Sequence, residues 1–486
     1  MSLYKNLFKQ TLIYGLATVL PRMLTFLLNP LYVKQLPKQE FADVSIVFAW
    51  LVFFNVILSY GMETAFFRFF NSENDKKKVN STAMLSIFWS SIAFLVIALL
   101  YRKSLADWGN INVEYVTYTI WILALDALVI IPFSSLRAEK RPLFYAVIKI
   151  GSVFINVAFN LFFLLVLPKL AHNNPDGIFS TFYYPGFEVG YIFISNLIAS
   201  LATFLVLSPD YFKLNWKFDW ALWRKMMNYG FPILLAGLAF AINEHFDKIF
   251  LEKLHVPKSE IGAYSACYKI GMFMVLFRTA YSLGIEPFFF SHASNENAQQ
   301  TYATITKYFV IFGSFICLFV VAFIDLIKQP LVPNEEYWEA IKVVPLIVLA
   351  NFFLGIYTNL SVWYKLIDKT KIGAYISIIG AIVTLALNWI LIPKYSYYGS
   401  AIATIAAYGT MMVISFRMGQ KKYPIPYDIN RILGYLGLTI LFSAISFYIP
   451  YVRESYLIKI VLLSAFLYFI YHNEKDMLLR IIKRRS

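Results

Sequence analysis

Charged residues and cysteine are both scarce in this chain of 486 residues. Asp, Glu, Lys and Arg make up 15% of it, against roughly 25% in soluble domains. The two cysteines, Cys267 and Cys317, lie far apart in apolar stretches and do not have the spacing of metal ligands. This composition excludes a soluble globular enzyme, a disordered chain and a disulfide-rich secreted module.

Apolar residues are abundant instead. Hydrophobic residues make up 59% of the chain, and aromatic residues 19%, with 46 Phe and 34 Tyr. A helix that spans a membrane needs about 20 residues, so the apolar content is sufficient for roughly a dozen or more spans. The composition therefore predicts an all-α polytopic membrane protein.

Fourteen apolar windows mark the expected spans. They lie near residues 10–33, 41–62, 81–101, 114–136, 143–168, 187–208, 225–250, 261–285, 302–328, 339–363, 371–392, 398–418, 429–450 and 455–472. The first window is too long for a signal peptide, and no small-residue cleavage site follows a short apolar core. We therefore expect it to remain as the first helix.

The basic residues orient these spans. The formal net charge is +15, and cytoplasmic loops of membrane proteins collect Lys and Arg. With both termini in the cytoplasm, 25 Lys and Arg fall in inner loops and 10 in outer loops. We therefore expect an even number of spans. No basic run is interleaved with base-stacking aromatics in a soluble segment, so a nucleic-acid partner is not expected.

The sequence also repeats itself at an offset of 220–223 residues. Residues 37–45 resemble residues 257–265, and the segment that begins at Gly61 resembles the one that begins at Gly284. Six spans separate the copies, which predicts two six-helix lobes related by an axis along the membrane normal, with a substrate path between them. The expected domains are an N-lobe at 1–208, an interfacial linker at 209–224, a C-lobe at 225–420, and helices thirteen and fourteen with a basic cytoplasmic tail at 421–486.

Two of the expected helices carry a polar stripe with a cation. Arg22 lies near the middle of the first helix, on the face that also carries Asn29 and three threonines. A guanidinium at this depth costs at least about 2.5–3.5 kcal/mol unless it meets water or a partner. In the fifth helix, the stripe consists of Lys149, Ser152, Asn156 and Asn160.

The eighth helix adds two further cations, Lys269 and Arg278. They are nine residues apart, so a continuous α-helix would point them in opposite directions, and at most one would face the cavity. Three more basic residues, Lys307, Lys342 and Lys459, lie near helix ends, where we expect them to reach water.

The stripes and deep cations predict a water-filled cavity of positive potential that binds an anionic group. Phosphate is the commonest reason for fixed Arg and Lys side chains. The alternative is that the cations only pair with acids and hold helices together. The candidate acids for such pairs, or for coupling to an ion, are Asp126, Glu63 and Asp247, together with Glu244, which precedes Lys248 by one helical turn.

The whole chain resembles the Wzx-like oligosaccharide flippases of the MOP superfamily of exporters. The resemblance rests on the 6 + 6 + 2 arrangement of spans and on three segments: Gly61-Met62-Glu63-Thr64-Ala65-Phe66-Phe67-Arg68, Asp247-Lys248-Ile249-Phe250-Leu251 leading to Gly262-Ala263-Tyr264-Ser265, and Tyr398-Gly399-Ser400-Ala401. Relatives in the lipid II flippase branch carry cavity arginines on helices one and eight, and Arg22 matches the first of these.

The resemblance implies export of a polyprenyl-pyrophosphate-linked oligosaccharide from the cytoplasmic to the outer leaflet of a bacterial inner membrane, for O-antigen or capsule synthesis. Membrane lipid and other polysaccharide-assembly membrane proteins are the other expected partners. No cofactor is expected, and a proton gradient, a sodium gradient or the membrane potential is the candidate drive. The alternative is a MATE-type cation or drug antiporter. Drug-exporting relatives place a carboxylate in helix one, whereas this chain has Arg22 and no acid there.

Overall fold

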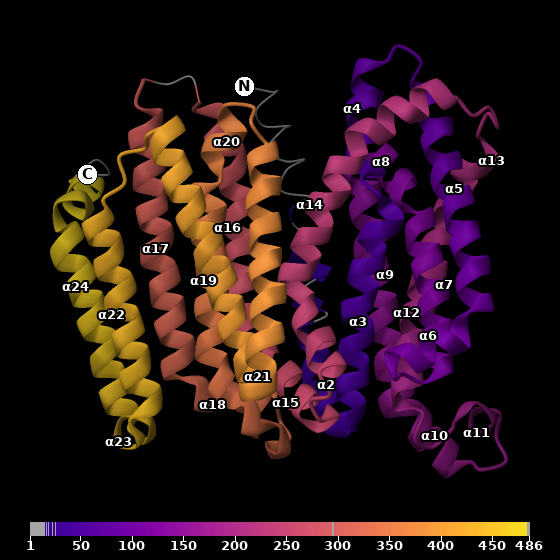
Figure 1. Cartoon of the computed structure of the whole chain (residues 1–486). Helices are drawn as coiled ribbons and strands as arrows, with labels where there is room; N and C mark the ends of the chain where they lie inside the picture. The colour runs from indigo at the N-terminus through magenta and orange to yellow at the C-terminus, as the bar shows by residue number, and fades with distance from the viewer. Residues whose placement is uncertain are drawn as a thin grey trace. The chain divides into compact units, whose positions relative to one another are not determined.

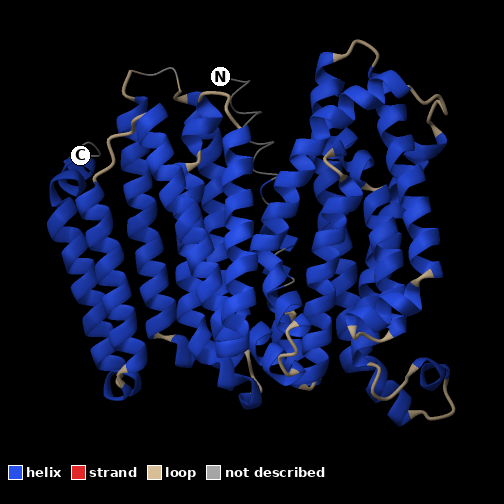
Figure 2. Ribbon diagram, viewed as in Figure 1, coloured by secondary structure: helices blue, strands red, loops and turns tan. Residues whose placement is uncertain are grey.

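The computed structural model describes residues 15, 17, 19–21, 23–24, 26–293 and 296–483. Within this part of the chain every regular element is a helix (Figure 2). The chain packs as two compact units: unit 1 comprises Met1–Ala266 and Asn388–Ser396, and unit 2 comprises Cys267–Leu387 and Tyr397–Ser486. The predicted all-α polytopic fold is therefore confirmed.

Unit 1 contains the helices that carry most of the predicted polar residues (Figure 1). They are α2 (Asn29–Gln35), α3 (Lys38–Ser59), α4 (Met62–Ser72), α5 (Lys76–Leu100), α6 (Arg102–Gly109), α7 (Val113–Leu128), α8 (Ile130–Ala138), α9 (Pro142–Leu161), the π-helix η1 (Phe162–Val166), α10 (Leu167–Asn173), α11 (Ile178–Phe182), α12 (Glu188–Leu207), α13 (Pro209–Phe212), α14 (Trp220–Lys253) and most of α15 (Lys258–Tyr268).

Unit 2 contains the remaining helices, except that Asn388–Ser396 of α21 belong to unit 1. They are the 3₁₀ turn η2 (Lys269–Gly271), α16 (Met272–Ser291), α17 (Ala298–Ala322), α18 (Ile324–Leu331), the 3₁₀ segment η3 (Glu335–Val343), α19 (Val344–Leu360), α20 (Val362–Leu366), α21 (Lys371–Lys422), α22 (Ile429–Tyr448), α23 (Pro450–Glu454) and α24 (Tyr456–Lys483).

Eleven helical ranges among the described residues are long and apolar enough to cross a membrane. One of them, α21, contains a non-helical Ser396 (φ 49°, ψ −137°), and it covers the two spans predicted at 371–392 and 398–418. The span predicted at 261–285 corresponds to α15, η2 and α16, which the 3₁₀ turn interrupts. Part of the first predicted span, residues 10–14, 16, 18, 22 and 25, lies outside the described residues, and Arg22 is therefore among the residues that are not described.

Short polar side chains fix several helix starts. Five helices begin behind an Asp or Asn whose side chain accepts a hydrogen bond from a backbone N–H in the first turn, which satisfies a donor that the helix leaves free. These caps are Asp75, Asn112, Asp219, Asn334 and Asp428. Because Asp219 caps α14, this helix begins at Trp220, and only residues 213–219 of the predicted interfacial linker are non-helical.

Both copies of the sequence repeat contribute to close packing inside unit 1. A Cβ atom at Gly61 would collide with the backbone of Gly230, and one at Gly262 would collide with the carbonyl of Lys38. Lys258 Nζ lies 2.6 Å from Asp43 Oδ1, so the start of α15 is bound to α3. The lobe boundaries predicted from the repeat stay a prediction, because the two compact units divide the chain at other positions.

Two of the three lysines expected to reach water do not do so. The side chain of Lys459 is only 1% exposed, and its ammonium lies 5.1 Å from the Tyr456 ring centre. Lys307 donates to Glu474 over 2.6 Å. A carboxylate on a neighbouring helix binds Lys307, and an aromatic ring of its own helix lies beside Lys459, so snorkelling is the wrong description for them. Lys342 is exposed, as expected.

Candidate functional site

The polar stripe predicted on the fifth span lies on α9. This helix starts with Pro142 at its first position, where the missing N–H costs nothing. Lys149 lies two turns further on and is partly buried, and its Nζ sits 4.2 Å from the centre of the Phe133 ring of α8. Among the described residues, Lys149 makes no ion pair within 4 Å. The stripe therefore presents a half-buried ammonium that an aromatic face stabilises.

A carboxylate on α7 lies close to this lysine. Asp126 Oδ1 accepts a hydrogen bond of 2.7 Å from the Ser200 hydroxyl of α12. Asp126 and Lys149 interact electrostatically, although their charged atoms are beyond ion-pair distance. The predicted candidates Asp126 and Lys149 are therefore neighbours in one unit, and Asp126 is held mainly by a serine.

The C-terminal part of the stripe forms hydrogen bonds with α2. Asn160 is fully buried, and its Oδ1 accepts a 2.9 Å hydrogen bond from the Tyr32 hydroxyl. Its Nδ2 donates to the backbone oxygen and the Oδ1 atom of Asn156, at 2.8 and 3.0 Å. Asn29 is also buried, one turn before Tyr32. These amides form a buried polar column between α2 and α9, and Asn160 holds the two helices together.

Glu63 has a partner at the other end of unit 1. Its Oε1 accepts a hydrogen bond of 2.8 Å from Arg137 Nη1, and both side chains are 40–47% exposed. Arg137 also stacks on Phe67, with its guanidinium carbon 4.6 Å from the ring centre. An exposed pair of this kind contributes little to stability, and it places Glu63 at a surface.

A second charged cluster joins α14 to α15. Lys248 Nζ lies 3.0 Å from Asp247 Oδ2, and the same oxygen accepts a 2.8 Å hydrogen bond from Tyr264. Asp247 is 6% exposed and Lys248 9%. Glu244, partly buried, lies one turn earlier on α14. This cluster is a buried ion pair with a tyrosine as its third member.

The two cations predicted on helix eight lie in unit 2. Lys269 is in the 3₁₀ turn η2, and Arg278 is in α16, both partly buried. Arg278 faces α19, because its Cδ lies 3.8 Å from where a Cβ of Gly355 would stand. The expectation of opposite directions assumed a continuous α-helix. The 3₁₀ turn breaks that continuity, so the angle between the two side chains no longer follows from their spacing.

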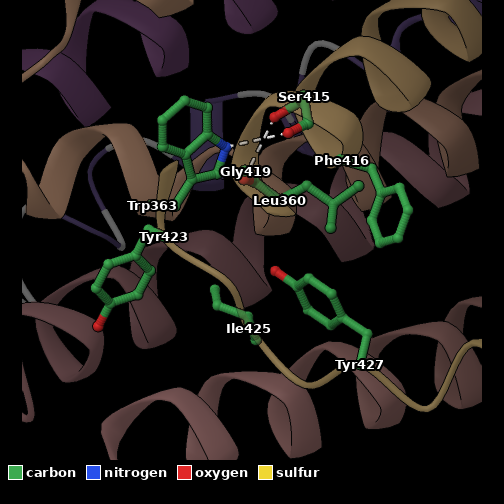
Figure 3. Close-up of a pocket in the computed structure, with 8 residues that line it drawn as sticks. All are labelled: Leu360, Trp363, Ser415, Phe416, Gly419, Tyr423, Ile425 and Tyr427. Atoms are coloured by element: carbon green, nitrogen blue, oxygen red, sulfur yellow. Dashed lines mark hydrogen bonds between the residues drawn. The ribbon is translucent and has the colours of Figure 1, made fainter. Parts of the chain in front are cut away.

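Two spaces lie between the helices described above. The first lies between α20, the end of α21 and the following linker, around Trp363, whose Nε1 donates to the Ser415 carbonyl over 3.1 Å (Figure 3). It leaves no room for a water molecule, so packed side chains fill this space and it is not a ligand site. The second, in unit 1, has a volume of about 260 Å³ and a mixed polar and aromatic lining that includes Gln35, Lys169 and Glu188.

The sequence could have indicated one of the missed residues. Tyr32 follows Asn29 by three positions and so continues the polar stripe of the first helix along the same face. The partners Phe133, Ser200 and Tyr264 carry no such signal, because they come from other helices. Among the described residues no group of His, Cys, Asp and Glu could hold a metal ion.

Comparisons with known proteins show the family to which the chain belongs. The model of the polysaccharide biosynthesis protein family matches residues 7–281, and the MatE family model matches residues 232–390. An uncharacterized membrane protein of Methanocaldococcus jannaschii is 22% identical over 428 residues, which cover 80% of this chain and 79% of the relative.

Solved structures share the fold. The lipid II flippase MurJ, in an inward closed conformation, superposes with a TM-score of 0.72 at 16% identity, over 96% of this chain and 100% of that chain. An inward-facing multidrug resistance transporter of the MATE family superposes with a TM-score of 0.65 at 14% identity, over 85% of this chain and 95% of that one. A MOP superfamily transporter from Pyrococcus furiosus, described as having a binding pocket of reversed polarity, superposes with a TM-score of 0.57 at 15% identity, over 88% of this chain and 96% of that one.

Proposed function

Because the chain belongs to the polysaccharide biosynthesis protein family and is a membrane transporter of the MOP superfamily, we propose that it flips a lipid-linked oligosaccharide. The proposed substrate is a polyprenyl-pyrophosphate-linked glycan, and the proposed direction is from the cytoplasmic to the outer leaflet of a bacterial inner membrane, with both termini in the cytoplasm. Export would supply the synthesis of a cell-surface polysaccharide.

The choice of an anionic substrate over a cationic one depends on one observation. Lys149 is a membrane-embedded ammonium that lies over the Phe133 ring and has no carboxylate within ion-pair distance among the described residues. An embedded cation that no carboxylate pairs with directly is costly, and such cations mark substrate or ion pathways. A pyrophosphate supplies the missing negative charge and several acceptor oxygens, whereas a cationic drug would repel the ammonium.

In the proposed mechanism the predicted polar residues have separate roles. Lys149 and Arg22 bind the pyrophosphate, and a helix-eight cation, Lys269 or Arg278, completes the positive field. Asn156 contacts the sugars, and Asn160 keeps α2 and α9 together through Tyr32. The polyprenyl tail stays in lipid. Alternating access, driven by an ion gradient or the membrane potential, releases the glycan outside, where other polysaccharide-assembly membrane proteins take it up.

The experiment that tests this proposal is ligand-dependent thermal unfolding of the purified protein. A ligand at 100 times its Kd adds about 2.7 kcal/mol to the free energy of unfolding. We expect a polyprenyl-pyrophosphate glycan to stabilise the wild type, and Lys149→Gln and Arg22→Ala to abolish that gain. Lys459→Gln is the matched control, because it removes another membrane-embedded lysine that lies near an aromatic ring, outside the proposed site.

Two results would reject the proposal. One is that the glycan stabilises Lys149→Gln and Arg22→Ala as strongly as the wild type. The other is that organic cations stabilise the protein and the pyrophosphate lipid does not. The second result would favour the MATE-type antiporter, and Asp126 would then be the acid to replace, because it is the carboxylate nearest the α9 stripe.

A further inference from the structure

The cavity of about 260 Å³ in unit 1 lies where η1 and α10 meet α12 and the end of α2. In Figure 1, α10 and α11 project at this end of the unit, the end that also carries α6. Gln35 follows Tyr32 by one turn of α2, and Phe163 follows Asn160 by one turn of the helix. The cavity therefore continues the buried polar column, which has Lys149 at its other end.

Four polar side chains line this cavity, and their hydrogen-bonding groups have no partner among the described residues. Gln35, Lys169, Tyr183 and Glu188 line it, and none of these four side chains makes a hydrogen bond or ion pair with another described residue. They supply an amide, an ammonium, a phenol and a carboxylate. Together they offer donors and acceptors in several directions, which is the set that a ring carrying several hydroxyls requires.

An aromatic wall completes the cavity. The rings of Phe163 and Tyr191 stack with centres 5.2 Å apart and 13° between their planes. The Tyr191 hydroxyl donates to the Phe182 carbonyl and accepts from the Tyr184 N–H, both at 2.7 Å. Tyr191 is therefore fixed, and because it is only 4% exposed, its ring supports Phe163 from behind. The partly buried ring of Phe163 offers an apolar wall with a weakly negative face, which attracts the C–H groups of a sugar ring.

The backbone of this wall is unusual. Residues Phe162–Val166 form a π-helix inside an otherwise α-helical span, and π-turns of this kind occur frequently at functional sites. The wider turn places three consecutive residues, Phe163, Leu164 and Leu165, along the same cavity. A regular α-helix would spread three consecutive residues around its circumference.

Charge and size restrict the ligand class. Lys169 and Glu188 carry opposite charges, and Glu40 lies near enough to act electrostatically on Glu188. The cavity therefore has no excess of positive charge for a pyrophosphate. Its volume of about 260 Å³ is below the range of roughly 300–1,000 Å³ of pockets for drug-sized ligands, so a single sugar ring is the appropriate size.

We propose that this cavity binds one neutral hexopyranose unit of a glycan. Phe163, supported by Tyr191, would stack against the ring, and Glu188 and Gln35 would bind its hydroxyls. The inference rests on the proposed function only for the source of the sugar, which would be the head group of the transported lipid. Sugar binding itself is measurable without transport, without a lipid and without Lys149.

The test is saturation-transfer NMR on the full-length protein in lipid nanodiscs. The probes are methyl glucoside, methyl galactoside, methyl mannoside and N-acetylglucosamine, with inorganic pyrophosphate and tetraphenylphosphonium as competitors. We expect at least one sugar to bind and neither competitor to displace it. Glu188→Ala and Gln35→Ala should each weaken binding by about tenfold, as the loss of a hydrogen bond predicts. Glu114→Ala, which removes an exposed acid from the first turn of α7, should have no effect.

Gln35→Trp is the second variant, because it fills the cavity without removing a hydrogen bond to the described protein. It should abolish sugar binding while the melting temperature stays within a few degrees of the wild type. Binding of no probe sugar, unchanged binding in Gln35→Trp, or displacement by tetraphenylphosphonium would each overturn this proposal. Lys149→Gln separates the two proposals: it should keep sugar binding and lose stabilisation by the pyrophosphate lipid.

Discussion

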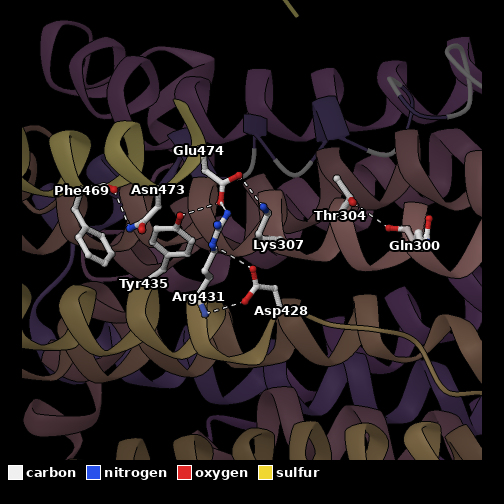
Figure 4. A network of polar contacts seen from close by, with 9 residues as sticks. All are labelled: Gln300, Thr304, Lys307, Asp428, Arg431, Tyr435, Phe469, Asn473 and Glu474. Atoms are coloured by element: carbon white, nitrogen blue, oxygen red, sulfur yellow. Dashed lines mark hydrogen bonds and ion pairs between the residues drawn. The ribbon is translucent and has the colours of Figure 1, made fainter. Parts of the chain in front are cut away.

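Glu474 on α24 accepts a hydrogen bond from Lys307 on α17, with 2.6 Å between Nζ and Oε2. Figure 4 shows that the same carboxylate also meets α22: its other oxygen, Oε1, accepts from Arg431 Nη1 at 3.2 Å and from the Tyr435 hydroxyl at 3.1 Å. The Glu474 side chain is 3% exposed. One buried carboxylate therefore holds three helices of unit 2 together and pairs with two cations.

Replacing Glu474 should destabilise the protein strongly. Glu474→Gln leaves Lys307 and Arg431 without their shared counter-charge, and breaking a buried pair costs roughly 3–5 kcal/mol. We expect a clear fall in the melting temperature in detergent, measured by intrinsic fluorescence. Glu454→Gln is the control, because Glu454 is exposed and its loss should be nearly neutral.

A double-mutant cycle tests whether the loss of stability comes from the interaction between Lys307 and Glu474 or from the loss of a polar side chain at each position. Lys307→Met alone should also destabilise the protein, and the pair Lys307→Met with Glu474→Gln should cost less than the two single changes added together. Strict additivity would show that Lys307 and Glu474 do not interact in the folded protein.

The spans were predictable from the sequence, and the partners of the charges were not. A membrane helix must show an apolar run of sufficient length, so windows of this kind located all the spans that the structure describes. Lys307 lies near the end of an expected helix, a position that predicts contact with water. Its partner Glu474 lies 167 positions away in sequence and beyond the last expected span at 472. Which charged residues pair depends on how each helix is rotated about its own axis. An apolar window carries no information about that rotation.

The repeat supplies an internal control for a packing prediction. Gly61 has a φ of +73°, and a Cβ there would collide with the backbone of Gly230, whereas a Cβ at its repeat counterpart, Gly284, meets nothing within 4 Å. Gly61→Ala should therefore cost about 2 kcal/mol or more through backbone strain and overlap. Gly284→Ala should be neutral or slightly stabilising. Equal melting temperatures for the two variants would refute the close approach of α14 at Gly61.

Stability should fall at acid pH through an ion pair that lies outside the spans. Asp325 of α18 accepts two hydrogen bonds from Arg453 of α23, at 2.8 and 2.9 Å. The Arg453 guanidinium, with a further contribution from Lys328, holds the pKa of Asp325 well below its usual value. A lowered pKa means that the pair stabilises the protein above the unfolded pKa of about 3.9, and that this stability is lost as the pH falls below it.

The variant Asp325→Asn tests this pH dependence. It should be less stable than the wild type at neutral pH by roughly 1.5–3 kcal/mol, the usual contribution of hydrogen bonds to charged groups. The difference should shrink as the pH falls below about 4, which melting curves over a pH series would resolve. Parallel curves for the two proteins down to pH 3 would contradict the assignment.

The last prediction concerns the role of Asp247. Lys248 and Tyr264 both bind this buried carboxylate, so Asp247→Asn should destabilise the protein by roughly 3–5 kcal/mol, because it breaks a buried ion pair. Replacing the pair together, by Asp247→Asn with Lys248→Met, removes both charges and should recover most of that loss. If Asp247 only holds α14 against α15, the folded double variant will export glycan at a rate close to that of the wild type. If Asp247 instead carries the coupling proton or sodium ion, the double variant will fold and yet fail to export, because no restored packing replaces an ion-binding carboxylate. Melting temperature and export measured on the same variants therefore separate a structural acid from a coupling acid.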